Sequence, residues 1–530
     1  MASLLATYRG RGHKLGTQFA QIETAKKTFA GEKREEAAAQ RVQQGPAQGK
    51  RERWFFMSTH TGNLTDRVWK AGIYKRKYGE EQPCWKVGMF KVRLPFVHYN
   101  WSFPEMFQAL FMCATCLGAI PVLTEVLGVS YDVALSMVII NGFLYCLHVL
   151  LGDPVVPGWI TPAIPLITAF LTNGYAMGPE RNKALIALQM LVGIIFLFFG
   201  ITGLGAKLID LIPNSLKAGI LMGGGISAVL GEFKDTGRFN VYPVAIIIGV
   251  LVAFFCLFSP QCEYMRKKHK WINAVGKFGM LPAIIIAVIV GPIVGEIAVP
   301  TVEFWPLIKI PEFSNIWNQL SPFAIGFPSV QTFIQAVPMA VVVYIIAFGD
   351  FVTSEALITE ADEVRQDEKI DFDANRSNVV SGVRNVVMAF VCPYTQMCGP
   401  LWAAVTAAVS QRYKEGPEAM DSFYSGAGTF RWSTFIGVSL IPISSLLQPV
   451  LPVALSLTLL VQGYICTRLS MEMCKTSIER GICGVMGAVL ATRGATWGLA
   501  VGIIMYLLLK FYSGKQAKDE GIQVKSAEEN

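Results

Sequence analysis

The acidic residue best placed for chemistry in this 530-residue sequence is Asp350. It follows a long uncharged stretch, residues 336–349, and the hydroxyl-bearing Thr353 and Ser354 come one helical turn after it. An ionisable group at membrane depth is energetically costly and usually functional. The pattern predicts a coupling-ion site, where the carboxylate binds Na⁺ together with hydroxyl oxygens, or carries a proton. The alternative is a helix-end carboxylate at the cytoplasmic surface, because further acidic residues follow.

Two short segments combine prolines, a glycine and an adjoining apolar run. They are residues 153–165, the first break, and residues 392–402, the second break. Proline cannot donate a backbone hydrogen bond and resists helix interiors, so each break predicts a short extended stretch before a half-helix. Matching breaks in two halves of a membrane chain are typical of a transporter site built from inverted repeats. A pair of ordinary Pro-kinked helices is the alternative.

Several side chains at these breaks could contact a ligand. The N-terminus of a half-helix offers free N–H groups and a partial positive charge, which suits an anion or a carbonyl oxygen. No Arg or Lys lies in residues 331–351 or 393–410, so anion binding is expected to depend on helix ends and hydroxyls. The candidate contacts are Trp159, Thr161, Thr395 and Gln396, with Gln108 in the first apolar block. For each Thr, hydrogen bonding between neighbouring helices is the alternative.

The apolar blocks lack the motifs of an enzyme or a metal site. They contain no nucleophile elbow, catalytic triad or zinc-type spacing among the 11 Cys, and the 5 His are scattered. Cys113 and Cys116 have redox-like spacing, but small packing residues are the simpler interpretation inside an apolar helix. No rings of pore-lining charges indicate a channel. We expect no enzyme activity and no cofactor beyond a coupling Na⁺ or proton.

Composition indicates which elements must position these residues. The chain is 52% hydrophobic and 16% charged, whereas soluble domains are about 25% charged. The apolar residues form blocks that predict an all-α integral membrane protein with 14 segments, seven on each side of a Pro-rich stretch. The predicted blocks are 104–127, 132–151, 153–172, 183–203, 215–232, 242–258 and 274–298, then 331–358, 378–391, 394–410, 432–450, 452–469, 475–492 and 494–512. The predicted regions are a tail (1–100), a first repeat (101–298), a linker (299–330), a second repeat (331–512) and a polar C-terminal tail (513–530).

Charge is concentrated at the N-terminus. Residues 1–93 hold 19 Lys and Arg against 8 Asp and Glu. Nucleic-acid or lipid-headgroup binding could explain this excess, but the positive-inside rule is sufficient, so we expect no nucleic-acid partner. The start has no apolar signal-peptide core. We therefore expect a multi-pass protein of the inner or plasma membrane with both termini cytoplasmic, whose residues 1–90 can be deleted without loss of the transmembrane fold.

The sequence resembles two families that share one fold, the uracil/xanthine (nucleobase–ascorbate) permeases and the SulP anion transporters. The likeness covers roughly residues 103–512 and is strongest between 336 and 410. It is carried by these motifs: Phe107-Gln108, Gly349-Asp-Phe-Val-Thr-Ser354, Ala361-Asp-Glu-Val-Arg365, Asp373-Ala-Asn-Arg376, Gly382-Val-Arg-Asn385 and Pro393-Tyr-Thr395. The chain departs from the permeases at Ile346 and Gly399, where they carry carboxylates. Only about 18 residues follow Tyr512, fewer than the STAS domain that SulP proteins normally carry would need.

The resemblance implies a UraA-like fold with two inverted seven-segment repeats, divided into core and gate domains. Substrate would lie between the facing half-helices of segments 3 and 10, with segment 8 alongside, in a homodimer that moves by an elevator mechanism. The substrate-contacting residues would be Gln108, Trp159, Thr161, Asp350, Thr395, Gln396 and Gly399, and the coupling-ion residues Asp350, Thr353 and Ser354. The sequence thus predicts a secondary transporter of a small anion or planar polar solute, coupled to Na⁺ or H⁺. An uncoupled, channel-like anion protein is the alternative.

Overall fold

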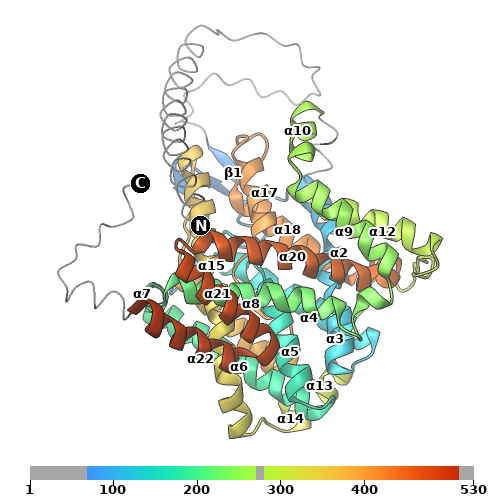
Figure 1. Cartoon of the computed structure of the whole chain (residues 1–530). Coiled ribbons are helices and arrows are strands. Elements are labelled where there is room, and N and C mark those ends of the chain that lie inside the picture. Colours follow the sequence, from blue (N-terminus) through green and yellow to red (C-terminus); the bar gives the residue numbers. More distant parts are fainter. Residues whose placement is uncertain (1–67, 270–271, 273–279, 512–530) are drawn as a thin grey trace, which may run out of the picture. The chain divides into compact units, whose positions relative to one another are not determined.

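The computed structural model describes residues 68–269, 272 and 280–511, which are mainly helical (Figure 1). Most of the predicted N-terminal tail and all of the predicted C-terminal tail lie outside the described residues. The helices of the first half are α2 (Phe103–Leu117), α3 (Ala119–Leu127), α4 (Tyr131–Leu150), α5 (Ile164–Gly174), α6 (Pro179–Thr202), α7 (Gly205–Leu211), α8 (Asn214–Phe233), α9 (Pro243–Phe258), α10 (Pro260–Lys268) and α12 (Leu281–Ile293).

The second half begins with the short helices α13 (Phe313–Leu320) and α14 (Pro322–Ile325). It continues with α15 (Val330–Val364), α16 (Ala374–Val391), α17 (Ala403–Tyr413), α18 (Phe423–Ser439), α19 (Ile441–Leu447), α20 (Leu451–Met473), α21 (Ser477–Arg493) and α22 (Ala495–Tyr506). By length and apolar composition, six stretches of the described chain could each cross a membrane, or seven if the bent pair α9 and α10 is one span. The chain is thus a multi-pass membrane protein.

Local sequence explains where the helices begin. Prolines occupy the first turn of α5, α6 and α9, where a missing N–H costs nothing. The Ser130 side chain caps α4 by accepting a hydrogen bond from the backbone N–H of Val133. Thr476 and Glu479 form a reciprocal capping box at the start of α21.

Two of the groups in which the helices pack bear on the site. In one, α6 lies along α16, and α15 runs beside α6. In the other, α20, α21 and α22, drawn in red tones in Figure 1, pack against α8. Glycines allow the first group to approach closely: a Cβ on Gly193 of α6 would lie 2.9 Å from the backbone N of Val386 on α16. Small residues at helix interfaces are typical of membrane bundles.

Residues 68–102, the described part of the chain before α2, pack against the rest of the described chain, which the sequence did not predict. Strands β1 (Trp69–Ala71) and β2 (Tyr74–Arg76) form one hairpin, and β4 (Trp85–Val87) and β5 (Phe90–Val92) form another. Strand β3 (Glu80–Glu81) pairs in parallel with β7 (Glu368–Lys369), which follows α15. The sequence shows no apolar stripe here because buried polar side chains make these contacts.

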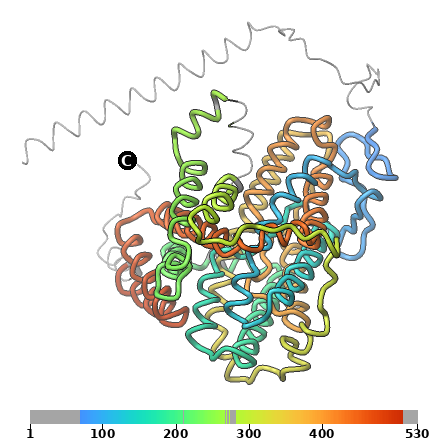
Figure 2. The backbone as a smooth tube through the Cα atoms, turned by 90° about the vertical axis from the view of Figure 1, so that its right-hand side faces the viewer, coloured from blue at the N-terminus to red at the C-terminus, as the bar shows by residue number. Residues whose placement is uncertain are grey.

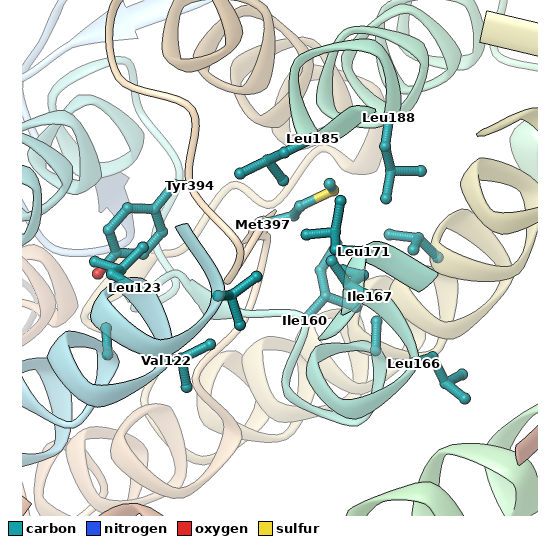
Figure 3. Packing of buried hydrophobic residues seen from close by; sticks show 14 of the residues in the cluster. Val122, Leu123, Ile160, Leu166, Ile167, Leu171, Leu185, Leu188, Tyr394 and Met397 are labelled. Carbon is teal, nitrogen blue, oxygen red and sulfur yellow. The ribbon is translucent and has the colours of Figure 1, made fainter. Parts of the chain in front are cut away.

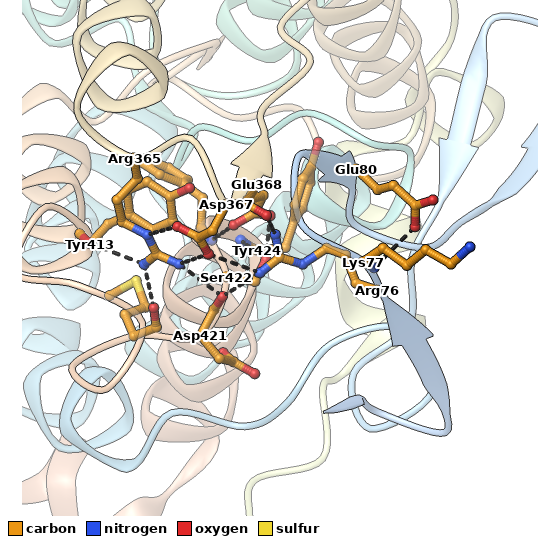
Figure 4. A network of polar contacts seen from close by, with 12 residues as sticks. Arg76, Lys77, Glu80, Arg365, Asp367, Glu368, Tyr413, Asp421, Ser422 and Tyr424 are labelled. Atoms are coloured by element: carbon orange, nitrogen blue, oxygen red, sulfur yellow. Dashed lines mark hydrogen bonds and ion pairs between the residues drawn. The ribbon is translucent and has the colours of Figure 1, made fainter. Parts of the chain in front are cut away.

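A polar network, the tail clamp, fastens these strands (Figure 4). The Arg76 side chain is 1% exposed and donates to the backbone carbonyls of Asp367 and Asp421. Arg365 makes two hydrogen bonds to the Asp367 carboxylate, at 2.8 and 2.7 Å. Glu368 accepts from the Ser422 hydroxyl at 2.7 Å. The tail clamp thus joins the N-terminal strands to the loops before α16 and α18.

The stretch predicted as a linker also makes specific contacts. Figure 2 shows its extended yellow-green part crossing the molecule before α13. Lys309 N donates to the Ser439 carbonyl at 2.9 Å, and Ile441 N donates to the Leu307 carbonyl at 3.0 Å. Glu312 N bonds the Ser136 hydroxyl of α4 at 3.0 Å. The segment is held against the ends of α4 and α18.

Candidate functional site

The two breaks cross as extended chains. Strand β6 (Gly158–Trp159) of the first break pairs antiparallel with β8 (Cys398–Gly399) of the second, with Gly158 opposite Gly399. Beyond the strands, Ile160 N donates to the Met397 carbonyl at 3.1 Å, and Trp402 N donates to the Val156 carbonyl at 2.6 Å. We call this pair of strands the crossing. The prediction that the two breaks are extended and face each other is confirmed.

Polar side chains from neighbouring helices satisfy the backbone groups that the breaks release. The Asn385 side chain of α16 accepts from Cys398 N and donates to the Cys398 carbonyl, both at 3.0 Å. Gln189 of α6 accepts from Tyr394 N at 2.8 Å. Thr406 accepts from Val156 N at 3.1 Å. These bonds explain how extended backbone is tolerated inside a helical bundle.

Close backbone approach explains the glycine of the first break. A Cβ on Gly158 would lie 2.8 Å from the Leu401 carbonyl oxygen and 3.0 Å from Trp402 Cα. Apolar side chains hold the half-helix α5 beside the crossing. Figure 3 shows Ile167 of α5 among buried neighbours that include Met397 of the second break. The crossing is therefore built on close backbone contact and an apolar support.

Two buried arginines lie beside the crossing. Arg384 of α16 and Arg431 of α18 are 1% and 2% exposed. The Arg384 guanidinium carbon lies 3.3 Å from the centroid of the Tyr145 ring, and that of Arg431 lies 4.5 Å from the same centroid. Arg384 donates to the Asn141 side chain, and Arg431 donates to the Pro157 carbonyl of the first break. Two cationic guanidinium groups thus lie close to one aromatic ring.

Neither of these arginines pairs with a carboxylate among the residues that the structure describes. Burying an ion without a counter-charge costs several kcal/mol, which cation–π contact offsets only in part. Further hydrogen-bonding atoms nearby are buried without a partner in the described chain: the Nε atoms of both arginines, Gln396 Nε2 and Tyr394 Oη. The half-helices α5 and α17, 11 residues each, start without a side-chain cap. The site is positive and rich in free donors, so it suits an anion.

Sequence reasoning missed both arginines. It searched for cations only within residues 331–351 and 393–410, whereas Arg384 lies on α16, just before the second break, and Arg431 lies on α18. A signal was present, because Arg384 lies within the family-like motif Gly382–Asn385. A lone Arg inside an apolar block is as costly as a lone Asp, and the same argument applied to α16 would have found it.

Five of the predicted substrate residues belong to the two breaks. Thr395 and Gln396 are buried, and the Thr395 hydroxyl donates to Gln396 Oε1 at 2.8 Å. Trp159 is half-buried, and Thr161 Oγ1 lies 3.4 Å from the Trp159 carbonyl oxygen. Gly399 pairs within the crossing. The structure therefore brings these residues close together. Their contact with substrate stays a prediction.

The other predicted residues lie on continuous helices. Gln108 is half-buried on α2. Asp350 is half-buried on α15, whose 35 residues pass beside the 3₁₀ turn Thr161–Ala163 and beside α17. The hydroxyls of Thr353 and Ser354 donate to the carbonyls of residues 349 and 350, at 2.9 and 2.8 Å. Those hydroxyl oxygens keep lone pairs for a cation, but the described contacts do not gather them around the carboxylate. A coupling site there remains a prediction.

No protein-family model and no curated protein matches the sequence. Solved structures do match. The transmembrane domain of a cyanobacterial bicarbonate transporter, BicA, is 14% identical with a TM-score of 0.48, over 76% of this chain and 97% of that one. The murine Slc26a9 anion transporter in its inward-facing state is 13% identical with a TM-score of 0.50, over 78% of this chain and 69% of that one. A further SLC26A9 structure is 14% identical with a TM-score of 0.46, over 76% of this chain and 65% of that one. The match to murine Slc26a9 shows a shared fold.

Proposed function

We propose that the protein is a secondary transporter that binds a small anion at the crossing. One observation carries the proposal: two guanidinium groups are buried beside the crossing without a carboxylate partner in the described chain. A bound anion would balance that charge and would accept hydrogen bonds from Arg384, Arg431 and Gln396. The uncapped starts of α5 and α17 add partial positive charge.

The proposal includes the architecture that the matched breaks suggest. Fourteen segments form two inverted repeats, and the crossing lies where the repeats meet. The core would carry the two breaks, and its movement against the gate would carry the anion across by an elevator mechanism, in a homodimer of the inner or plasma membrane with cytoplasmic termini. Support comes from the antiparallel pairing of β6 with β8 and from the fold shared with murine Slc26a9.

Coupling to an ion gradient is the second part of the proposal. Asp350 would bind Na⁺, with Thr353 and Ser354 oxygens, or carry a proton, because α15 passes beside the 3₁₀ turn of the first break and beside the half-helix α17. A channel-like protein without coupling is the alternative. In liposomes a transporter shows saturable counterflow of the labelled anion, whereas a channel shows flux that rises linearly with concentration.

Anion binding is tested by thermal stability of the purified full-length protein. Sodium salts of chloride, sulfate and bicarbonate, and also uracil, are added at constant ionic strength, with gluconate as the balancing ion. A ligand that binds the folded state raises the melting temperature. At a concentration of 100 times Kd it adds about 2.7 kcal/mol to the free energy of unfolding. We expect at least one inorganic anion to do so for the parent and not for Arg431→Gln.

The matched control is Arg468→Gln, because Arg468 is half-exposed on α20 and pairs with Glu472. It should retain the full response to the anion. Equal stabilisation of Arg431→Gln and the parent would refute binding at the crossing, and stabilisation by uracil alone would replace the anion with a nucleobase.

A further inference from the structure

Three titratable side chains form a buried chain beside the crossing. His148 of α4 is 0% exposed, Asp153 of the first break 1% and Cys398 of β8 2%. His148 Nδ1 lies 3.1 Å from Asp153 Oδ2, and His148 Nε2 lies 3.4 Å from Cys398 Sγ. Both ring nitrogens are therefore engaged, one with a carboxylate and one with a thiol. This order of acid, imidazole and thiol is the arrangement that stabilises an imidazolium–thiolate pair.

Two further contacts tie the chain to its surroundings. Arg384 donates to Cys398 Sγ, so the same guanidinium that lies beside the crossing contacts the sulfur. The Ser377 hydroxyl of α16 donates to Asp153 Oδ2 at 2.5 Å, while Asp153 Oδ1 has no partner in the described residues. A thiolate at Cys398 would compensate the positive charge of Arg384, whereas a neutral thiol would leave that charge uncompensated.

The other ionisable groups around the chain are few. From α4, Tyr145 contacts Arg384, and from α18 come Tyr424 and Arg431. From α16, Arg376 lies within electrostatic range of Asp153. Arg376 forms an ion pair with Asp371 at 2.9 Å, and Asp371 pairs with the partly exposed Lys91 at 2.7 Å. Charged groups thus run from the partly exposed Lys91 on β5 to the neighbourhood of Asp153.

We propose that His148, Asp153 and Cys398 form a proton site that links proton uptake to anion binding at Arg384. This inference deepens the proposed function and rests on it. Without the extra proton, Asp153 and Cys398 are negative and His148 and Arg384 are positive, so the four groups sum to zero. A proton from solution, delivered through His148, adds to Cys398 Sγ and forms the thiol. The four groups then carry one positive charge, which a monovalent anion beside Arg384 would balance, while Arg431 keeps its charge in both states.

The linkage is reciprocal. Protonation of Cys398 strengthens anion binding, and a bound anion favours protonation of Cys398 by the same factor. The transported unit is one proton with one monovalent anion, which is electroneutral. The site places the proton at the crossing, whereas the proposed role of Asp350 would place it on α15.

The transport experiment uses proteoliposomes of the full-length protein with the membrane potential clamped at zero. Initial uptake of ³⁶Cl⁻ and of [³⁵S]sulfate is measured at external pH 5.5 and 7.5. We expect acid to speed uptake of at least one anion by roughly fivefold or more, the lower end of ordinary coupling between sites. In Cys398→Ser, whose hydroxyl stays neutral at both pH values, the ratio should fall to about one. His148→Gln should likewise bring the ratio of uptake at pH 5.5 to uptake at pH 7.5 close to one.

The matched control is His269→Gln, because His269 is exposed in the loop after α10 and should keep the parent ratio. A pH ratio that persists in Cys398→Ser and His148→Gln would overturn this inference and leave anion transport standing. If the parent takes up neither anion at either pH, the proposed function fails and the inference fails with it.

A second measurement needs no variant that might misfold. Alkylation of Cys398 by N-ethylmaleimide in the purified parent is followed by peptide mass spectrometry at constant ionic strength, with chloride replacing gluconate. Because a bound anion favours the thiol over the reactive thiolate, chloride or sulfate should slow the reaction. A rate that neither anion changes, for a protein that the same anion stabilises thermally, would overturn the link.

Discussion

Asp153 of the first break and Asp350 of α15 are two acids that the structure surrounds differently. Asp153 is 1% exposed and contacts an imidazole of α4 and a hydroxyl of α16. Asp350 is half-buried on a continuous 35-residue helix, and no hydrogen bond to its carboxylate is described. The contrast teaches that an acid that stands out in sequence need not be the one that the fold surrounds with partners.

A large effect is expected from overpacking the crossing, where the backbones of the two breaks approach each other closely. Gly158→Ala places a methyl group 2.8 Å from a backbone oxygen that cannot rotate away. We expect a loss of about 1–3 kcal/mol, as for other overpacked cores, measured as a lower melting temperature in detergent. Gly174→Ala is the control, because a Cβ there meets no atom within 4 Å. Equal melting temperatures for the two variants would contradict the close approach.

The next effect separates the two acids directly. Asp153→Asn removes the negative charge of the carboxylate that His148 and Ser377 contact. Hydrogen bonds to a charged group contribute about 1.5–3 kcal/mol to stability. Asp350→Asn removes a carboxylate without a described partner, so its stability should stay within about 0.5 kcal/mol of the parent. Thermal unfolding of both variants measures the difference. A larger loss for Asp350→Asn would reverse the comparison.

Sequence reasoning reached the crossing but not its charges. Prolines and glycines at 153–165 and 392–402 are local signals, and they predicted both breaks and that the two face each other, whereas the strand pairing came from the structure. Asp153 contacts His148 and Ser377, and His148 in turn contacts Cys398; only folding brings Ser377 and Cys398 to the first break. The packing of residues 69–100 was missed for the same reason, since Arg76 finds Asp367 almost three hundred residues away.

A smaller effect extends the comparison to Asp367, an acid outside the candidate membrane spans. Burial alone would raise the pKa of Asp367, but hydrogen bonds from Arg365 and the charge of Arg76 outweigh it and lower the pKa. The tail clamp is therefore stabilised by this carboxylate above the unfolded pKa of about 3.9 and loses that stability as pH falls through the folded value. Burial raises the pKa of Glu368, which acts in the opposite direction.

Hydrogen exchange of residues 69–93 tests the tail clamp. Protection, taken relative to the intrinsic exchange rate at each pH, should fall as the pH drops below about 4 in the parent, and Asp367→Asn should show low protection already at pH 7. Exchange in Asp350→Asn should match the parent at every pH. Slow exchange in Asp367→Asn at pH 7 would show that other contacts hold these strands.

The smallest structural effect is paired with a functional one. Asp350→Asn should leave folding nearly unchanged, and if α15 carries the coupling ion it should abolish uptake driven by an ion gradient. Dependence of the parent on external Na⁺ would assign Na⁺, and dependence on pH alone would assign a proton. Unaltered gradient-driven uptake would move Asp350 to the surface-carboxylate interpretation and leave His148, Asp153 and Cys398 as the coupling site.

The most direct test of the account is the position of a bound anion. Crystals of the full-length protein grown in sodium bromide would be measured at the bromine absorption edge, where anomalous scattering locates bromide. The account predicts a peak beside the crossing, in contact with the guanidinium of Arg384 or Arg431, and its loss in Arg431→Gln. Bromide peaks confined to other sites, with none at the crossing, would contradict an anion site formed by the two buried arginines.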